Sequence, residues 1–362
     1  MKKGVFHRIF PPPKFLQMRT AGLDISDHSI RYVNLIGARN GFKIASFGAR
    51  RVPDGTIESG EVKDIDGLVK AFNGLKADLG TAFVNVSLPE ERAYIVKLRT
   101  PRLKRAEIRT GLDLQLSEHV PLSSSEAVFD YDLLGNQNKK RRGYLDVALS
   151  VMPRSSVEKY LAFLSRIKLL PMAFEIEAQA TARAVIPKGD QGTFMIVDLG
   201  ETRTGISVVE REVVVLSSSV NIGGQLITVS IQKALSVSFE EAERIKIEKG
   251  LTGGKQDDRL FPAIMSVVAA LRDEIGKHFM YWHTHKDQDG ESHPPIEKII
   301  LCGGNAPMHG LGDYLSSGLS MEAELANVMV NIRSLDEYIP DINFNESLRY
   351  ATAIGLALRD IS

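Results

Sequence analysis

The chain has 362 residues, of which 43% are hydrophobic and 25% are charged, a composition typical of a soluble globular protein that is long enough for two lobes. Lys and Arg together number 45, as do Asp and Glu, so no overall field attracts nucleic acid. One cysteine excludes an intramolecular disulfide, and the lack of both an apolar run of about 18 residues and a secretory signal predicts a cytoplasmic protein.

Residues 1–19 are expected to form a basic, aromatic tail ahead of the first strand. Five basic residues face no acidic residue in the first 20 positions, and Pro11–Pro13 imposes extended backbone. The tail is either an arm that docks on a membrane surface or partner, or a disordered leader. The second alternative is favoured.

Two segments have the same pattern of an apolar run, an aspartate, a tight polar turn and a second apolar run. The first spans residues 21–33 and contains Asp24, and the second spans residues 195–209 and contains Asp198. A turn of this kind points backbone N–H groups into a concavity that suits phosphate oxygens. An aspartate at its mouth can hold Mg²⁺ through water. Two such hairpins facing across a cleft would hold a nucleoside triphosphate from both sides.

The segments between the two hairpins predict a mixed sheet followed by an insert. A strand over 41–52, a helix over 65–79 and strands over 81–88 and 93–98 complete the first sheet. A helix over 102–120, a hairpin over 127–134 and 144–151 and a helix over 155–167 form the insert. The basic loop between the hairpin strands lacks interleaved aromatic residues, which favours a solvated tip over a nucleic-acid site.

The second half repeats this alternation of strands and helices. After the second hairpin, a strand is expected over 212–219, with helices over 225–235, 239–249 and 259–283. A strand over 296–302 ends at a glycine pair, and a last helix covers 345–360. Cys302, at the end of that strand, is expected to be a small buried apolar residue.

These segments resemble, in order, the motifs of the actin-like ATPase superfamily and of its FtsA and PilM branch. Gly22–Val33 and Ile196–Val209 are similar to the two phosphate segments, and Leu301–Leu311 to the adenosine segment. Ile222–Thr228 followed by Glu240–Lys246 resembles the Gly-Gly-to-Ala-Glu-x-x-Lys pattern of the branch. The resemblance implies an α/β fold of two ribonuclease H-like lobes with an inserted FtsA/PilM-type 1C subdomain.

The implied division places subdomain 1A at 20–98 and 168–190, subdomain 1C at 99–167, and subdomains 2A and 2B at 191–362. The resemblance also implies a site for ATP and Mg²⁺. The residues assigned to nucleotide binding are Asp24, Ser26, His28, Ser29, Asp198, Gly200, Thr202, Thr204, Gly223, Gly224, Glu243, Lys246, Gly303, Gly304, Asn305 and Met308.

Two positions in this site leave questions open. Most relatives have glycine where this chain has Ser26, and the serine narrows the turn. Glu177 is expected in a helix linking the lobes, where relatives place an acidic residue near the γ-phosphate. It either positions the attacking water or, like Glu175, is an ordinary first-turn acid favoured by the helix dipole.

The PilM resemblance implies a cytoplasmic protein, recruited to the inner face of the membrane, that docks the N-terminal cytoplasmic segment of a PilN-like inner-membrane protein. The docking groove would lie between subdomains 1A and 1C, where Leu112, Leu116 and Val120 are either peptide contacts or the insert's own core. Contacts with other pilus components are implied too, and self-association is left open. The alternatives are an FtsA-like filament-forming division ATPase and a sugar kinase of the same superfamily.

Overall fold

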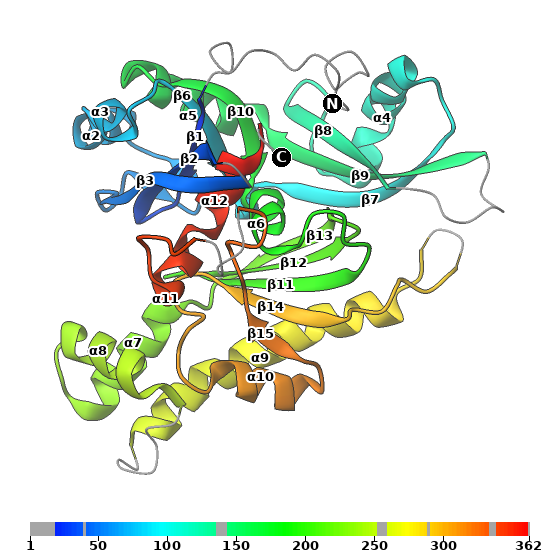
Figure 1. Ribbon diagram of the computed structural model, residues 1–362. Coiled ribbons are helices and arrows are strands. Elements are labelled where there is room, and N and C mark those ends of the chain that lie inside the picture. Colours follow the sequence, from blue (N-terminus) through cyan, green and yellow to red (C-terminus); the bar gives the residue numbers. More distant parts are fainter. Residues whose placement is uncertain are drawn as a thin grey trace.

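The computed structural model describes residues 19–38, 41–134, 143–251, 259–287, 290–332 and 338–360 (Figure 1). The tail expected over residues 1–19 lies outside the described residues up to position 18, as does the tip of the basic loop, residues 135–142.

The first lobe is built on a five-stranded sheet in the order β10-β6-β1-β2-β3. Strand β1 pairs antiparallel with β2 and parallel with β6, and β6 pairs parallel with β10. The carboxyl ends of these three parallel strands therefore meet at one edge of the sheet. The strands are β1 (Ala21–Ile25), β2 (Ser29–Ala38), β3 (Gly41–Arg51), β6 (Phe83–Leu88) and β10 (Leu170–Ile176).

The second lobe repeats the arrangement in the order β13-β12-β11-β14-β15. An antiparallel hairpin again opens the sheet, and β11 pairs parallel with β14. The two predicted Asp hairpins are thus confirmed as equivalent elements of two similar sheets. The strands are β11 (Thr193–Leu199), β12 (Thr204–Glu210), β13 (Val213–Val220), β14 (Lys298–Cys302) and β15 (Ala323–Leu325).

A third, antiparallel sheet forms the insert, with β7 (Tyr94–Pro101), β9 (Tyr144–Pro153) and β8 (Ala127–Leu134) in that order. The strand expected over 93–98 therefore does not complete the first sheet as predicted, because it pairs with β9 of the insert. Helix α4 (Arg105–His119) covers one face. Leu112 and Leu116 are fully buried and cluster with Val120 and the strand residues. These three side chains are the insert's own core, so the alternative that they contact a peptide is wrong.

Helices cover the sheets and join them. Those of the first lobe and the insert are α2 (Ile65–Phe72), α3 (Leu75–Leu79), η2 (Glu90–Arg92), α5 (Arg154–Arg166) and α6 (Glu177–Val185), beside the short hairpin β4 (Ile57–Glu58) and β5 (Glu61–Val62). The remainder are α7 (Gly224–Leu235), α8 (Phe239–Lys249), α9 (Leu260–Thr284), α10 (Leu311–Leu319), α11 (Phe344–Ser347), η5 (Leu348–Tyr350) and α12 (Ala351–Leu358).

Three helix predictions need correction. The helix expected over 65–79 is two helices, because Gly74 adopts a left-handed φ of 86° between them. The expected final helix is divided among α11, η5 and α12. The alternative that Glu175 is a first-turn helix acid is wrong, because it lies in β10, a strand that is not predicted from the sequence.

Helices α6 and α12 lie between the two large sheets, as Figure 1 shows for the green and red helices at the centre. Close backbone approach requires glycine at two contacts. A Cβ on Gly22 of β1 would overlap the carbonyl oxygen of Ala353 on α12, and one on Gly355 would overlap that of Ala180 on α6. Glycine therefore lets α12 lie directly on both β1 and α6.

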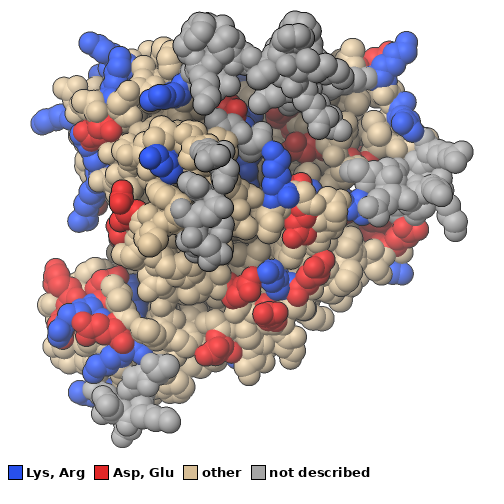
Figure 2. All heavy atoms as spheres, in the orientation of Figure 1, with Lys and Arg blue, Asp and Glu red and all other residues tan. Residues whose placement is uncertain are grey.

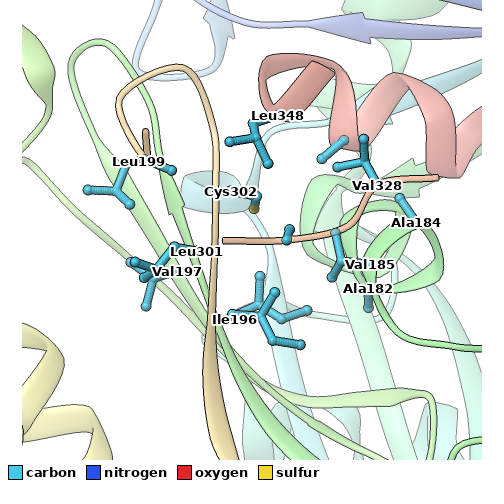
Figure 3. Close-up of a cluster of buried hydrophobic side chains, with 14 of the residues drawn as sticks. Ala182, Ala184, Val185, Ile196, Val197, Leu199, Leu301, Cys302, Val328 and Leu348 are labelled. Carbon is cyan, nitrogen blue, oxygen red and sulfur yellow. The ribbon is translucent and has the colours of Figure 1, made fainter. Parts of the chain in front are cut away.

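The largest core cluster joins these central helices to the second sheet. Figure 3 shows side chains of α6, β11 and β14 packed with Val328 and Leu348. Cys302 is fully buried within this cluster, and burial raises the pKa of its thiol well above the ordinary value. The prediction that Cys302 is a small buried residue is confirmed.

The visible surface carries both signs of charge. Lys and Arg side chains are interspersed with Asp and Glu over the face shown in Figure 2, in keeping with the balanced composition. Within the part of the chain that the structure describes, we find no helix with the length and apolar character needed to cross a bilayer.

Candidate functional site

The two Asp-hairpin turns converge on one cavity of about 140 Å³. Residues 26–28 and 200–203 lie beyond the ends of the strand pairs. The Ser26 and Gly200 amides close the turns by donating to the Ser29 and Arg203 carbonyl oxygens at 2.9 Å each, whereas the amides of residues 27–28 and 201–203 lie outside the β-ladders. The structure brings eight of the predicted site residues to the cavity wall: Asp24, Ser26, His28, Ser29, Glu177, Asp198, Gly200 and Thr202.

The two aspartates of the hairpins lie in different electrostatic surroundings. Ser87 on β6 donates a 2.9 Å hydrogen bond to Asp24 Oδ1, and an Arg31 nitrogen lies 3.9 Å from Asp24 Oδ2. Burial raises the pKa of Asp24, whereas Arg31 lowers it. Burial, with the nearby charge of Asp24, raises the pKa of Asp198 to about 6. Both carboxyl groups therefore favour a positive charge between or beside them.

Two further carboxylates at the cavity were missed from the sequence. Glu90 and Glu91 follow β6, and their side chains join that of Glu177 at the cavity wall. Burial raises the pKa of Glu90 to about 8, although Ser217 donates a hydrogen bond to it. Glu177, the first residue of α6, accepts a 3.3 Å hydrogen bond from the Glu90 amide, and burial raises its pKa well above the usual value.

The order of the strands explains why these acids meet. Asp24 lies near the end of β1, Glu90 follows the end of β6 after one intervening residue, Pro89, and Glu177 directly follows β10. Because these strands are parallel, residues at their carboxyl ends lie at the same edge. In the sequence, the only sign of these two acids is that Pro89-Glu90-Glu91 follows a buried strand. Their place at the cavity can be recognised only when the parallel pairing of β6 with β1 and β10 is known.

The remaining predicted residues form a neighbouring cluster behind the second turn. Lys246 is 4% exposed, and its Nζ lies 2.8 Å from Asn305 Oδ1 and 2.9 Å from Glu243 Oε2. Asn305 Nδ2 in turn donates to the Gly200 carbonyl oxygen at 2.8 Å. This cluster is therefore joined to the cavity through one amide side chain. Its other predicted members are Gly223, Gly224, Gly303, Gly304 and Met308.

Glycine is required at one of these positions. Gly303 has a φ of 89°, and a Cβ there would overlap the Asp198 carboxylate.

Thr204 has a different role from the one expected, because it is outside the cavity wall and its hydroxyl donates a 2.6 Å hydrogen bond to the Ile222 carbonyl. Met308 is 7% exposed and belongs to the large core cluster.

The charges at the cavity suit a nucleotide that arrives with a divalent cation. Among the described residues that line it, seven are carboxylic acids and two are arginines. A bare polyphosphate would be repelled, whereas a hydrated Mg²⁺ would be attracted by the acids. Over the same described ranges, no three His, Cys, Asp or Glu side chains are arranged to hold a metal ion directly. The donor set fits a cation held through water by Asp24 and Asp198.

Two sheets of the same strand order, each opened by an Asp hairpin that faces the other, define an actin-like ATPase fold. A family model for the type IV pilus assembly protein PilM matches residues 22–361, and this chain belongs to that family.

Solved structures share the fold. A structure of a PilM–PilN type IV pilus biogenesis complex has a TM-score of 0.77 at 18% identity, covering 95% of this chain and 99% of the other. MreB5 of Spiroplasma citri bound to AMPPNP has a TM-score of 0.54 at 11% identity, with coverages of 94% and 95%. The ethanolamine utilization protein EutJ of Carboxydothermus hydrogenoformans has a TM-score of 0.53 at 15% identity, with coverages of 96% and 90%.

Proposed function

We propose that this protein binds ATP with Mg²⁺ in the cavity between its lobes. The observation that carries the proposal is the convergence of two equivalent Asp-hairpin turns on that cavity. The MreB5 structure that shares this fold is bound to AMPPNP, which supports nucleotide binding by a protein of this fold.

The residues have distinct roles in this proposal. Asp24 and Asp198 would hold the hydrated cation, which neutralises the charge of the phosphates when it is bound. The backbone amides of residues 27–28 and 201–203 would face the phosphate oxygens. Gly303, Gly304 and the cluster around Lys246 would border the nucleoside. Glu177 would lie near the terminal phosphate, where it orders water.

We further propose that the protein is a scaffold of the pilus assembly machinery, located in the cytoplasm at the inner face of the membrane. Its partner would be the N-terminal cytoplasmic segment of a PilN-like inner-membrane protein. Membership of the PilM family and the resemblance to a PilM–PilN complex support this over an FtsA-like division protein or a sugar kinase. The division into subdomains 1A, 1C, 2A and 2B belongs to the same proposal.

The docking groove would run along β8, an edge strand of the insert. Val128 and Leu133 are 37% and 49% exposed on this strand. Asp132 of β8 and Arg183 of α6 line a cavity of about 450 Å³ beside it. An edge strand offers main-chain pairing to an extended peptide, and neighbouring pockets select its side chains.

Peptide binding tests this docking proposal directly. A fluorescently labelled peptide with the N-terminal sequence of the PilN-like protein from the same organism is titrated with the full chain, and anisotropy reports binding. Leu133→Asp should weaken binding at least tenfold. Leu114→Asp is the matched control, because Leu114 is 78% exposed on α4 of the same insert and should not affect affinity. Equal affinity for both variants would contradict docking along β8.

A further inference from the structure

Arg203 joins the turn of the second lobe to three residues of the first. The residue lies between β11 and β12, and its guanidinium forms an ion pair with Glu91. The Nη2 atom lies 3.3 Å from Asp27 Oδ2 and donates a 3.1 Å hydrogen bond to Ser59 Oγ. One side chain that lines the cavity therefore links the turn of the second lobe to the first lobe.

The contacts of Asp27 allow Arg203 to leave it. The two carboxylate oxygens of Asp27 also accept hydrogen bonds from the backbone amides of Ser59 and Gly60, each at 2.9 Å. These bonds remain when the guanidinium departs, so Asp27 keeps two donors. Burial raises the pKa of Glu91 even beside Arg203, so Glu91 can take up a proton after Arg203 leaves.

Arg203 is also well placed to meet a phosphate. It shares the turn with Gly200 and Thr202, two of the residues predicted to bind phosphate. Arg31, the other arginine at the described cavity wall, lies beside Asp24. A guanidinium can contact two phosphate oxygens at once, which gives it strong preference for that group.

We propose that Arg203 exchanges Glu91 and Asp27 for the terminal phosphate of a bound nucleoside triphosphate. The exchange rests on the nucleotide site proposed above. A diphosphate lacks the group that draws the guanidinium away, so Arg203 keeps its two carboxylates. Arg203 is in this way the positioning residue that selects a triphosphate over a diphosphate.

Calorimetric titration of the full chain with Mg-AMPPNP and Mg-ADP tests the exchange. The quantity compared is the ratio of the two affinities in the parent protein and in three variants. Arg203→Gln should reduce the triphosphate preference at least tenfold. Arg50→Gln is the control, because Arg50 pairs with Asp78 within the first lobe, away from the cavity, and its ratio should match the parent's.

Glu91→Gln separates the exchange from a purely structural bridge. This variant frees Arg203 from its competitor, so the triphosphate preference should rise. If Arg203 is only a bridge, Arg203→Gln and Glu91→Gln will both lower the melting temperature and leave the ratio unchanged. That result would overturn the exchange while the nucleotide site stands. If the parent binds neither nucleotide, the proposed site itself fails.

Discussion

Ser87 on β6 holds Asp24 of the neighbouring strand β1 through a 2.9 Å hydrogen bond from its hydroxyl. The same Oγ atom accepts a 2.8 Å hydrogen bond from the backbone amide of Ile25, the residue after Asp24, so β1 itself holds the serine side chain in place. The position of Asp24 at the cavity therefore depends on a residue that itself lies outside the wall.

Replacing Ser87 should affect both stability and ligand binding. Ser87→Ala leaves a buried carboxylate and a buried amide with one partner fewer, which should cost about 1–3 kcal/mol in the free energy of unfolding. It should also weaken Mg-ATP binding several-fold. Ser46→Ala is the matched control, because Ser46 accepts a 2.8 Å bond from Asn34 on the same sheet, away from the cavity. Equal losses of ATP affinity in both variants would contradict a specific role for Ser87.

The pKa of Glu90 predicts the pH dependence of stability. It is about 8 in the folded protein against 4.5 as the ordinary value, so between these pH values the folded state binds a proton that the unfolded chain releases. Stability in the absence of divalent metal should therefore fall as the pH rises from about 5 to 8. Glu90→Gln keeps an acceptor for Ser217 and should flatten this decline. Urea unfolding at several pH values across this range measures the stability of the parent and of Glu90→Gln. An equal decline of stability with pH in the two proteins would contradict the prediction.

The glycine contact between α6 and α12 can be tested by adding one methyl group. Gly355→Ala forces a Cβ against the Ala180 carbonyl, which should destabilise the protein by about 1–3 kcal/mol. Gly37→Ala is the control, because a Cβ on Gly37 meets no atom within 4 Å. Thermal unfolding compares the two, and a tolerated Gly355→Ala would show that α12 can move away from α6.

ATP turnover by the isolated protein should be slow or undetectable. Burial raises the pKa of Glu177 well above its ordinary value, which favours the protonated carboxyl, a poor acceptor for a proton from water. Phosphate release under saturating Mg-ATP measures the rate, with Glu177→Gln as the comparison. Rapid hydrolysis that disappears in this variant would show that Glu177 is an effective base.

Local patterns predicted the two hairpins, but not all the partners that complete the site. Each hairpin is contiguous in sequence, so its Asp and turn residues could be recognised directly. Strand β10 was missed because it contains Pro171, has a bulge there, and pairs with a strand far away in the sequence. Without β10, the place of Glu177 beside Glu90 could not be derived.

The contacts of Arg203 could not be predicted from the sequence for a different reason. The residue lies within a predicted turn, but the direction of its side chain depends on how the two lobes face each other. Its partners come from separate elements of the first lobe, Asp27 from the turn between β1 and β2 and Glu91 from the short helix η2. Only the assembled fold brings these charges together, so the ion pairs across the cavity could not be predicted from local pattern.

The central claim is that Mg-ATP binds between the lobes, and the melting temperature with and without excess Mg-ATP tests it most directly. A ligand at 100 times its Kd stabilises the folded state by about 2.7 kcal/mol, which should raise the melting temperature of the parent protein by several degrees. Asp198→Ala should abolish the rise, because it removes one of the two carboxylates that would hold the hydrated cation. A parent protein whose melting temperature is unchanged by Mg-ATP would contradict the claim.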